Sequence, residues 1–189
     1  MFKNEVNDMA TPAPTGTVEE PAFPDLTGVN VFVGGPIQHA IEEDGFYSPL
    51  QHALHSVIDA VKDTGGTVFS AHVAEKFGAD TPLFSPRQVS VRDFDWMQRC
   101  DVFIPVLPVR GDTLLRTDGT HVELGWASAL RKPIMLVTQQ PLAPSASHLL
   151  RGLPAIADVS LFDVAAVAQS PAELLASVSR AARPAVAAS

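Results

Sequence analysis

Val102-Phe103-Ile104-Pro105-Val106-Leu107 is a continuous apolar run. Further along the chain, Asp118-Gly119-Thr120-His121-Val122-Glu123-Leu124-Gly125 leads into a second apolar stretch, which stops at Lys132-Pro133. The first run predicts a buried strand, and the second predicts the beginning of a helix. Glu123 should therefore lie in the first turn of a helix, beside the carboxyl end of a central strand. In open α/β sheets this edge is where ligands bind.

This position would give Glu123 and its neighbours defined electrostatic surroundings. The amino end of a helix carries partial positive charge, which should keep the carboxylate ionised and able to act as a nucleophile. The free amides of Gly119 and Thr120 should be able to hold an anion such as phosphate. On the residues alone, Glu123 could equally be an acid that only stabilises a first turn.

Strands and helices are expected to alternate on both sides of this segment. The expected strands are 29–33, 67–71, 102–107, 134–138 and 158–162. The expected helices are 49–62, 86–99, one that opens near 119, 145–150, and one after Ser170-Pro171-Ala172-Glu173, where Ser170 should be the N-cap and Glu173 should complete a capping box. This alternation predicts an α/β fold, a doubly wound (Rossmann-like or flavodoxin-like) parallel five-stranded sheet with helices on both faces.

The composition is typical of a small globular enzyme. Of the 189 residues, 46% are hydrophobic and 18% are charged, which predicts one domain with its own core. We expect a flexible N-terminal arm over 1–25, a single domain over 26–182 and a flexible tail over 183–189. The arm lacks the apolar segment of a signal peptide, and no apolar run reaches the length of a membrane span. A cytoplasmic location is therefore expected.

Charge and cysteine content exclude several classes of function. The net charge is −8, with 13 basic and 21 acidic residues, which argues against binding to nucleic-acid polymers or anionic membranes. A small phosphorylated substrate is still compatible, since local donors suffice to bind it. The single cysteine, Cys100, excludes an internal disulfide and is expected in the core. Neither a G-x-G-x-x-G nor a Walker A pattern is present, so no cofactor is expected.

Two more segments complete an ordered set of motifs. Residues 29–37 read as a strand that runs into a Gly-Gly-Pro turn, and Arg92-Asp93-Phe94-Asp95-Trp96 precedes the central strand. The order strand-GGP, RDxDW, GTxxELG and KP, over about residues 28 to 155, resembles the nucleoside 2-deoxyribosyltransferase-like superfamily of N-glycosidic enzymes. The likeness is greatest to nucleoside 5′-monophosphate N-glycosidases of the CMP and hydroxymethyl-CMP hydrolase type, found in nucleoside-antibiotic pathways.

The resemblance implies two catalytic carboxyl groups. Cleavage of an N-riboside requires stabilisation of an oxocarbenium-like centre and protonation of the departing base, as in retaining glycosidases. Glu123 matches the family's nucleophile and Asp93 its acid. From the residues alone, Asp93 could instead form an ion pair with Arg92 or Arg99.

Two neighbouring acids must be weighed against Asp93. Asp95 is a competing candidate for the acid, because it lies two residues further on and could face another way. Asp101 lies just before the central strand, where the family also tends to carry an acid, and is expected to cap structure.

Phe32 is the residue that bears on the sugar. The resemblance implies a tyrosine here in related deoxyribonucleotide enzymes, with a hydroxyl that contacts the nucleophile and crowds the 2′ position. Phenylalanine removes that hydroxyl, which implies a ribonucleotide substrate. The alternative is an apolar residue of a buried strand with no functional role.

The expected substrate contacts come from several loops. Gly34 and Gly35 are expected to line the site. The resemblance places Thr117 at a hydroxyl position of the phosphate site, together with Gly119 and Thr120. It also places Ser147 where a serine reaches the phosphate in the neighbouring subunit, which implies a homodimer.

The sequence departs from the family's pattern in the first loop. Pro36 stands where a serine is usual, and Gln38 where an arginine is usual. His39, Arg110 or Arg116 are candidates to compensate.

The base is expected to stack on Phe46 and Tyr47, although these residues could equally anchor the helix that follows. His121, Glu123 and His39 do not form a recognised ligand spacing, and no metal is expected.

Three functions remain open at this point. The first is hydrolysis of a pyrimidine ribonucleoside 5′-monophosphate, with CMP or a modified CMP favoured. The second is a nucleoside 2-deoxyribosyltransferase, in which a base replaces water as the acceptor. The third is a non-catalytic nucleotide sensor, against which the pair Asp93 and Glu123 argues.

Overall fold

Five parallel strands form the central sheet of this protein, whose computed structural model describes residues 23–183. Their order across the sheet is β4 (Thr67–Phe69), β1 (Asn30–Gly34), β5 (Val102–Leu107), β8 (Ile134–Thr138) and β9 (Val159–Asp163). Counted along the chain, this is the order 2-1-3-4-5 of flavodoxin-like sheets. The expected fold class is therefore confirmed. The predicted arm over 1–25 and tail over 183–189 lie almost wholly outside the described residues.

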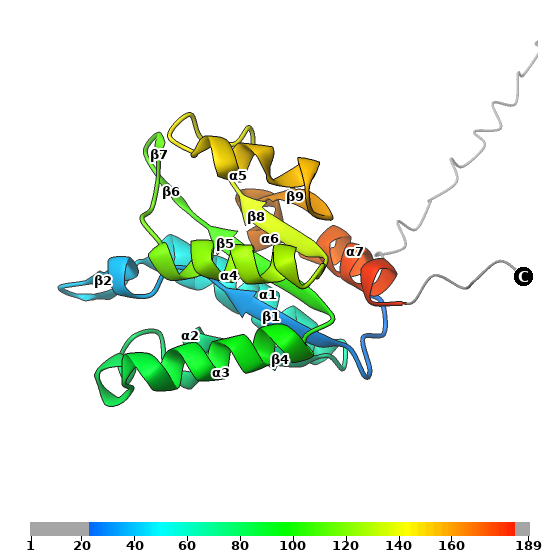
Figure 1. Cartoon of the computed structure of the whole chain (residues 1–189), viewed down its shortest axis with the longest axis horizontal. Coiled ribbons are helices and arrows are strands. Elements are labelled where there is room, and N and C mark those ends of the chain that lie inside the picture. Colours follow the sequence, from blue (N-terminus) through cyan, green and yellow to red (C-terminus); the bar gives the residue numbers. More distant parts are fainter. Residues whose placement is uncertain (1–22, 184–189) are drawn as a thin grey trace, which may run out of the picture.

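Helices cover both faces of the sheet (Figure 1). One face carries α1 (Ser48–Asp63), α6 (Val164–Gln169) and α7 (Ala172–Ala182). The other carries α3 (Pro86–Arg99), α4 (Asp118–Ala129) and α5 (His148–Gly152).

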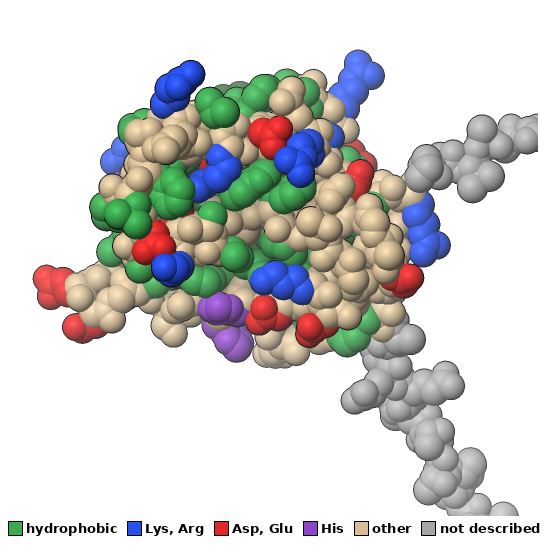
Figure 2. Space-filling model, turned by 90° about the horizontal axis from the view of Figure 1, so that it is seen from below, with side chains coloured by type: hydrophobic (Ala, Val, Ile, Leu, Met, Phe, Trp, Pro, Cys, Tyr) green, Lys and Arg blue, Asp and Glu red, His purple; other side chains and the backbone are tan. Residues whose placement is uncertain are grey.

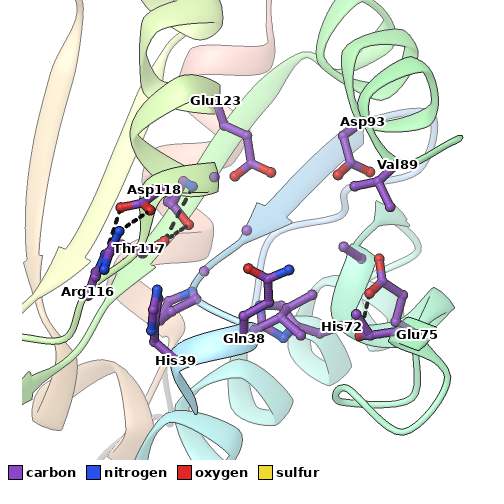
Figure 3. A pocket seen from close by; sticks show the side chains of 18 residues that line it. Gln38, His39, His72, Glu75, Val89, Asp93, Arg116, Thr117, Asp118 and Glu123 are labelled. Atoms are coloured by element: carbon purple, nitrogen blue, oxygen red, sulfur yellow. Dashed lines mark hydrogen bonds and ion pairs between the residues drawn. The ribbon is translucent and has the colours of Figure 1, made fainter. Parts of the chain in front are cut away.

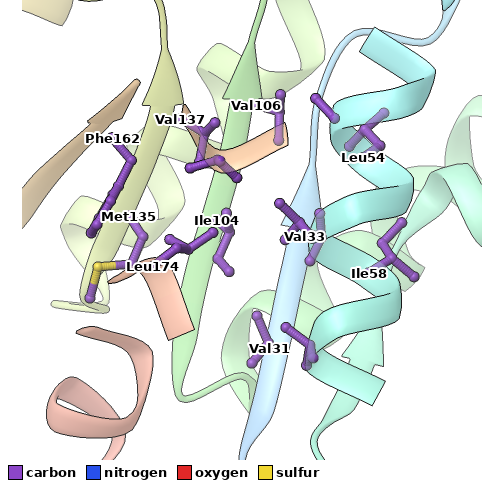
Figure 4. Close-up of a cluster of buried hydrophobic side chains, with 14 of the residues drawn as sticks. Val31, Val33, Leu54, Ile58, Ile104, Val106, Met135, Val137, Phe162 and Leu174 are labelled. Atoms are coloured by element: carbon purple, nitrogen blue, oxygen red, sulfur yellow. The ribbon is translucent and has the colours of Figure 1, made fainter. Parts of the chain in front are cut away.

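The core consists of two apolar layers because side chains along a strand point alternately to the two faces. On β1, Val31 and Val33 pack against α1 in the layer drawn in Figure 4, whereas Phe32 points to the opposite layer. All six residues of β5 are buried, as expected for a central parallel strand that is covered on both faces.

Short elements that were not predicted connect the main strands and helices, and most of them lie near the carboxyl ends of the strands. Two antiparallel hairpins are formed by β2 (Ile41–Glu42) with β3 (Gly45–Phe46) and by β6 (Val109–Arg110) with β7 (Thr113–Leu114). The others are η1 (Gln38–Ala40), α2 (Ala71–Ala74), η2 (Thr81–Leu83) and η3 (Leu153–Ala155). These turns are shorter than the windows over which periodicity is visible.

The β2–β3 hairpin projects from the body and carries acidic side chains at its end (Figure 2). On the face shown in Figure 2, basic side chains lie singly among acidic and apolar ones. This pattern does not resemble the basic stripe of a nucleic-acid binder. No helix within residues 23–183 has both the length and the apolar character that crossing a membrane requires.

The predicted ends of the elements differ in accuracy. The strands 102–107 and 134–138 and the helix 86–99 are confirmed at both ends. The expected N-cap at Ser170 is wrong, because Ser170 ends α6, with its amide donating to Ala166 O at 2.9 Å. Helix α7 begins after Pro171 without a side-chain cap, so the capping box with Glu173 does not form.

Candidate active site

A cavity opens at the carboxyl ends of β1 and β5, where the connections lead to opposite faces of the sheet. This is the switch point at which open α/β sheets bind ligands. Loop residues after β1, α2, η2 and α3 form one wall, and the first turns of α4 form the other. Figure 3 shows Arg116, Thr117, Asp118 and His39 on one side, Asp93, Glu75 and His72 on the other, and Glu123 between them.

Helix α4 begins earlier than expected. Thr117 is its N-cap, and the Thr117 hydroxyl accepts from the amide of Thr120 at 3.3 Å and contacts the Thr120 hydroxyl at 2.6 Å. The helix therefore starts at Asp118, and Glu123 lies in the second turn. The expectation that Glu123 occupies the first turn is wrong by about one turn.

The surroundings of Glu123 favour its neutral form. The residue is 9% exposed, and its Oε2 is buried without a hydrogen-bond partner among residues 23–183. Burial and the nearby Asp93 raise the pKa of Glu123 to about 8, although Arg92 opposes the increase. The expectation that the helix terminus keeps this carboxyl ionised is also wrong, because that influence fades beyond the first turn.

Asp93 faces Glu123 across the cavity from α3 (Figure 3). It is buried, and its Oδ1 accepts from Arg92 Nε at 2.8 Å. Burial raises the pKa of Asp93, while Arg92 opposes the increase. The ion pair with Arg92 considered from the sequence is thus present, but it is buried rather than on the surface.

The two neighbouring acids lie elsewhere. Asp95 is exposed, pairs with Arg99 at 2.9 Å and does not line the cavity. Asp101 accepts from the amide of Asn30 at 2.8 Å, so it has a structural role, as expected, but its partner is the distant start of β1.

Gly34 and Gly35 line the cavity, and a side chain at either position would meet close neighbours. A Cβ atom at Gly34 would lie 2.7 Å from Glu123 Oε2, and one at Gly35 would lie 3.0 Å from the carbonyl oxygen of Val106. Glycine at these positions therefore lets the first loop lie against Glu123 and the end of β5 without a close contact.

The mouth of the cavity holds the candidate phosphate contacts. Thr117, Gly119 and Thr120 line it, as do Arg116 and His39. Arg116 pairs with Asp118 at 2.8 Å and is largely exposed. Arg110, another candidate from the sequence, instead contacts Glu42 and lies over the ring of Tyr47.

Four of the expected substrate contacts do not line the cavity. Phe32 is fully buried and packs against the rings of Trp96 and Phe103. Phe46 and Tyr47 pack against the core that includes α1, which matches the alternative that they anchor this helix. Ser147 is the N-cap of α5 and accepts from the amide of Leu150.

Other cavity residues were missed from the sequence: His72, Glu75, Thr81 and Val89. Burial lowers the pKa of His72 to about 3, so its ring is neutral, and neither nitrogen has a partner in the described part of the chain. The signal that would have found His72 is its place just after β4, at the edge of the sheet that binds ligands.

Two buried carboxyl groups thus face one cavity from two helices, and such a pair can supply a nucleophile and an acid. Across residues 23–183, no three His, Cys, Asp or Glu side chains are grouped so that they could hold a metal ion.

Comparisons with known proteins add a family and a fold. A family model for nucleoside 2-deoxyribosyltransferase matches residues 43–148, which is more than half of the chain. The solution structure of BlsM is 27% identical, with a TM-score of 0.62 over 83% of this chain and 96% of that one. The Clostridium botulinum CMP N-glycosidase BcmB is 23% identical, with a TM-score of 0.52 over 75% and 96%. No curated protein matched the sequence.

Proposed function

This chain belongs to the nucleoside 2-deoxyribosyltransferase family, and within that family we propose that it hydrolyses the N-glycosidic bond of a pyrimidine ribonucleoside 5′-monophosphate. CMP or a modified CMP is the favoured substrate, and the products are the free base and ribose 5-phosphate. The observation that carries the proposal is the buried pair Asp93 and Glu123, which face each other across the cavity at the switch point of the sheet.

In the proposed reaction, the Glu123 carboxylate attacks C1′ while the bond from C1′ to the base breaks. The Asp93 carboxyl group donates its proton to the departing base. Water then cleaves the glycosyl ester, with Asp93 accepting the proton of the water molecule. The pair needs one proton in total, on Asp93 when the bond breaks. Burial without a hydrogen-bond partner favours the protonated form of Glu123 in the free site, so in the proposed reaction substrate binding moves the proton to Asp93.

The distribution of charge along the cavity supports a nucleotide with a terminal phosphate. The amino end of α4 lies at the mouth, where its free amides suit an anion, and Arg116, which is paired with Asp118, and His39 lie nearby. Glu123 lies between this end and the side formed by Asp93, Glu75 and His72. A nucleotide with its phosphate at the mouth would place its sugar at Glu123 and its base beside Asp93.

The choice of pyrimidine and ribose rests on the resemblance to CMP N-glycosidases and on Phe32. BcmB is a CMP N-glycosidase by name, but at 23% identity it is evidence for the fold alone. Phe32 provides no hydroxyl group in the layer beneath Glu123, which is consistent with a ribose substrate.

We further propose that the protein is a homodimer in which Ser147 completes the site of the second copy. Ser147 lines an apolar groove between α4 and α5, which also includes Leu149 and Ile156, 87% and 78% exposed. Apolar side chains exposed to this extent favour burial against a partner. Light scattering should give the mass of a dimer, and a mixture of Glu123→Ala and Ser147→Ala variants should recover part of the activity. A monomer at assay concentration would contradict the proposal.

The proposed reaction is tested by incubating the protein with a panel of nucleoside 5′-monophosphates and measuring the free base by chromatography. We expect base release from CMP or from a modified CMP, and little from nucleosides without phosphate. Addition of a second free base distinguishes the alternative, a 2-deoxyribosyltransferase, because a transferase would form a new nucleoside or nucleotide. Binding of nucleotides without any turnover would instead favour a sensor.

A further inference from the structure

Arg92 connects Asp93 to a second buried carboxylate. Its Nε donates to Asp93 Oδ1 at 2.8 Å, and its Nη2 donates to Glu75 Oε1 at 2.7 Å. Glu75 is almost fully buried at the end of α2, and its Oε2 accepts from the hydroxyl of Thr81 at 2.6 Å. The chain of contacts is therefore Thr81–Glu75–Arg92–Asp93, and three of these four residues line the cavity.

The plane of the Arg92 guanidinium group is held by two aromatic rings. Its Cζ lies 5.2 Å from the centre of the Phe84 ring and 4.8 Å from that of Trp96. Its remaining nitrogen, Nη1, is buried and has no partner within residues 23–183. Arg92 thus has two anionic partners, and its single positive charge is divided between them.

This division leaves one oxygen of Asp93 available to a substrate. Oδ1 is occupied by Arg92, and the part of the chain that the structure describes gives Oδ2 no hydrogen bond. An Asp carboxylate that had Arg92 to itself would hold a proton only weakly, whereas one without Arg92 would be neutral when buried. Because Glu75 takes part of the Arg92 charge, the proton affinity of Asp93 should lie between these two cases.

We propose that Glu75 and Arg92 are a positioning pair: Arg92 orients Asp93, and Glu75 takes up part of the Arg92 charge, so that Asp93 and Glu123 together keep one proton at neutral pH. The positioning role rests on the proposed function, because it takes Asp93 to be the acid of that reaction. Neither Glu75 nor Arg92 is required to contact the reacting atoms.

The other titratable groups around the cavity do not replace this effect. His72 is neutral, and Arg116 and Asp118 at the mouth pair with each other. His39 also lies at the mouth, away from Asp93. The charges next to the acidic pair therefore come from Arg92 and Glu75.

The proposal predicts shifts of opposite sign when either charge is removed. Since activity requires the pair to hold a single proton, the rate should have a bell-shaped dependence on pH. Glu75→Gln keeps an acceptor for Arg92 and removes a negative charge, so both limbs of the profile should move to lower pH by about one unit. Arg92→Gln should move both limbs to higher pH, and the double variant should lie near the wild type.

The experiment measures kcat/KM for CMP against pH, together with the ¹³C NMR titration of the side-chain carboxyls of Asp93 and Glu123 in the free protein. Arg99→Gln, which breaks the exposed pair with Asp95 on the same helix, is the matched control and should shift neither measurement. If Arg92→Gln does not fold, the test rests on Glu75→Gln alone, which should shift both limbs and both carboxyl titrations to lower pH.

Carboxyl titrations that do not move, or that move in the same direction in both variants, would overturn the positioning pair. The NMR titration also separates the two proposals. Opposite shifts in a protein that releases no base from any nucleotide would support the pair and reject the proposed reaction. Base release from a nucleotide, together with carboxyl titrations that do not shift, would support the proposed reaction and reject the positioning pair.

Discussion

The two walls of the cavity present the same chemical group in different surroundings. On the α3 wall, Asp93 is held by Arg92, which in turn contacts Glu75. On the α4 wall, Glu123 has a buried oxygen with no hydrogen-bond partner among the described residues. Among residues 23–183, Asp93 has an ion-pair partner in Arg92, whereas Glu123 forms no ion pair. In the free protein, ionisation is therefore easier at Asp93, and the proton of the pair belongs to Glu123.

This difference shows that a resting protonation state need not match the catalytic one. A nucleophile must be ionised and an acid must be protonated when the bond breaks. If Glu123 is the nucleophile and Asp93 the acid, as proposed, the resting site has the reverse arrangement, and the energy of substrate binding has to overcome it. A protein whose acidic pair served only to stabilise the fold would have no reason to bury a carboxyl without a partner.

The largest expected effect is on the α4 wall. Glu123→Gln keeps the shape of the side chain but cannot form the glycosyl ester, so base release should fall by about three orders of magnitude or more. Initial rates with CMP measure this loss, and Glu173→Gln on the exposed surface of α7 is the matched control. Retention of more than roughly a tenth of the rate would show that Glu123 is not the nucleophile.

The α3 wall should give a loss that depends on the leaving group. Asp93→Asn removes the acid but keeps the contact with Arg92, and the rate with CMP should fall by about 10²- to 10⁴-fold. A substrate whose base leaves without protonation should lose much less. Asp95→Asn is the control, because Asp95 lies outside the cavity. If Asp95→Asn had the larger effect, the roles of the two aspartates would be reversed.

The sequence was sufficient to predict the sheet and the two acids but not their protonation. Apolar runs such as 102–107 are visible without tertiary information, and Asp93 and Glu123 were found by their motifs. The state of Glu123 depends on Gly34, Asp93 and Arg92, which come from distant parts of the sequence. Its prediction therefore required the packing of α3 against α4 and β1.

The aromatic contacts to the base could not be predicted from sequence for the same reason: their positions depend on tertiary packing. Phe46 and Tyr47 follow the acidic hairpin in sequence, but the hairpin turns them toward the core. Cavity residues such as His72 and Glu75 lie on a helix of one turn, whose length gives no periodic signal. Segments near the carboxyl ends of strands are thus where prediction from sequence was least accurate, and they are also where the site lies.

A smaller effect should appear in stability rather than activity. The pKa of Glu123 is about 8 in the folded protein, above the usual value of 4.5. Its contribution to stability is therefore fully present below pH 4.5 and is lost as the pH rises through 8. Glu123→Gln stays neutral, so its free energy of unfolding should exceed that of the wild type above pH 8 by a few kcal/mol, on the order expected for such a shift. Urea unfolding at pH 6 and pH 8.5 measures this, with Glu173→Gln as the control. An equal pH dependence in wild type and variant would mean that Glu123 is ionised in the fold.

The smallest effect concerns the layer beneath the α4 wall. Phe32 does not line the cavity, but its ring centre lies 5.2 Å from that of Phe103, and Phe103 Cε2 is 3.1 Å from the Cβ position of Gly34, beside Glu123. A hydroxyl added by Phe32→Tyr would need a partner in this buried layer, and the free oxygen of Glu123 is available as one. Such a contact would hold Glu123 near the sugar and disfavour a 2′-hydroxyl.

We therefore expect the wild type to prefer CMP to dCMP, and Phe32→Tyr to change the ratio of kcat/KM for the two substrates by about tenfold toward dCMP. The ratio is the appropriate measurement, because base and phosphate contacts are common to both nucleotides and cancel. Phe162→Tyr, on β9 in the opposite core layer, is a control for the general cost of adding a buried hydroxyl. An equal rate on both sugars in the wild type, with no change in Phe32→Tyr, would show that Phe32 only fills the core. In that case Glu123 on the α4 wall would attack C1′ of either nucleotide, and this wall would not discriminate ribose from deoxyribose.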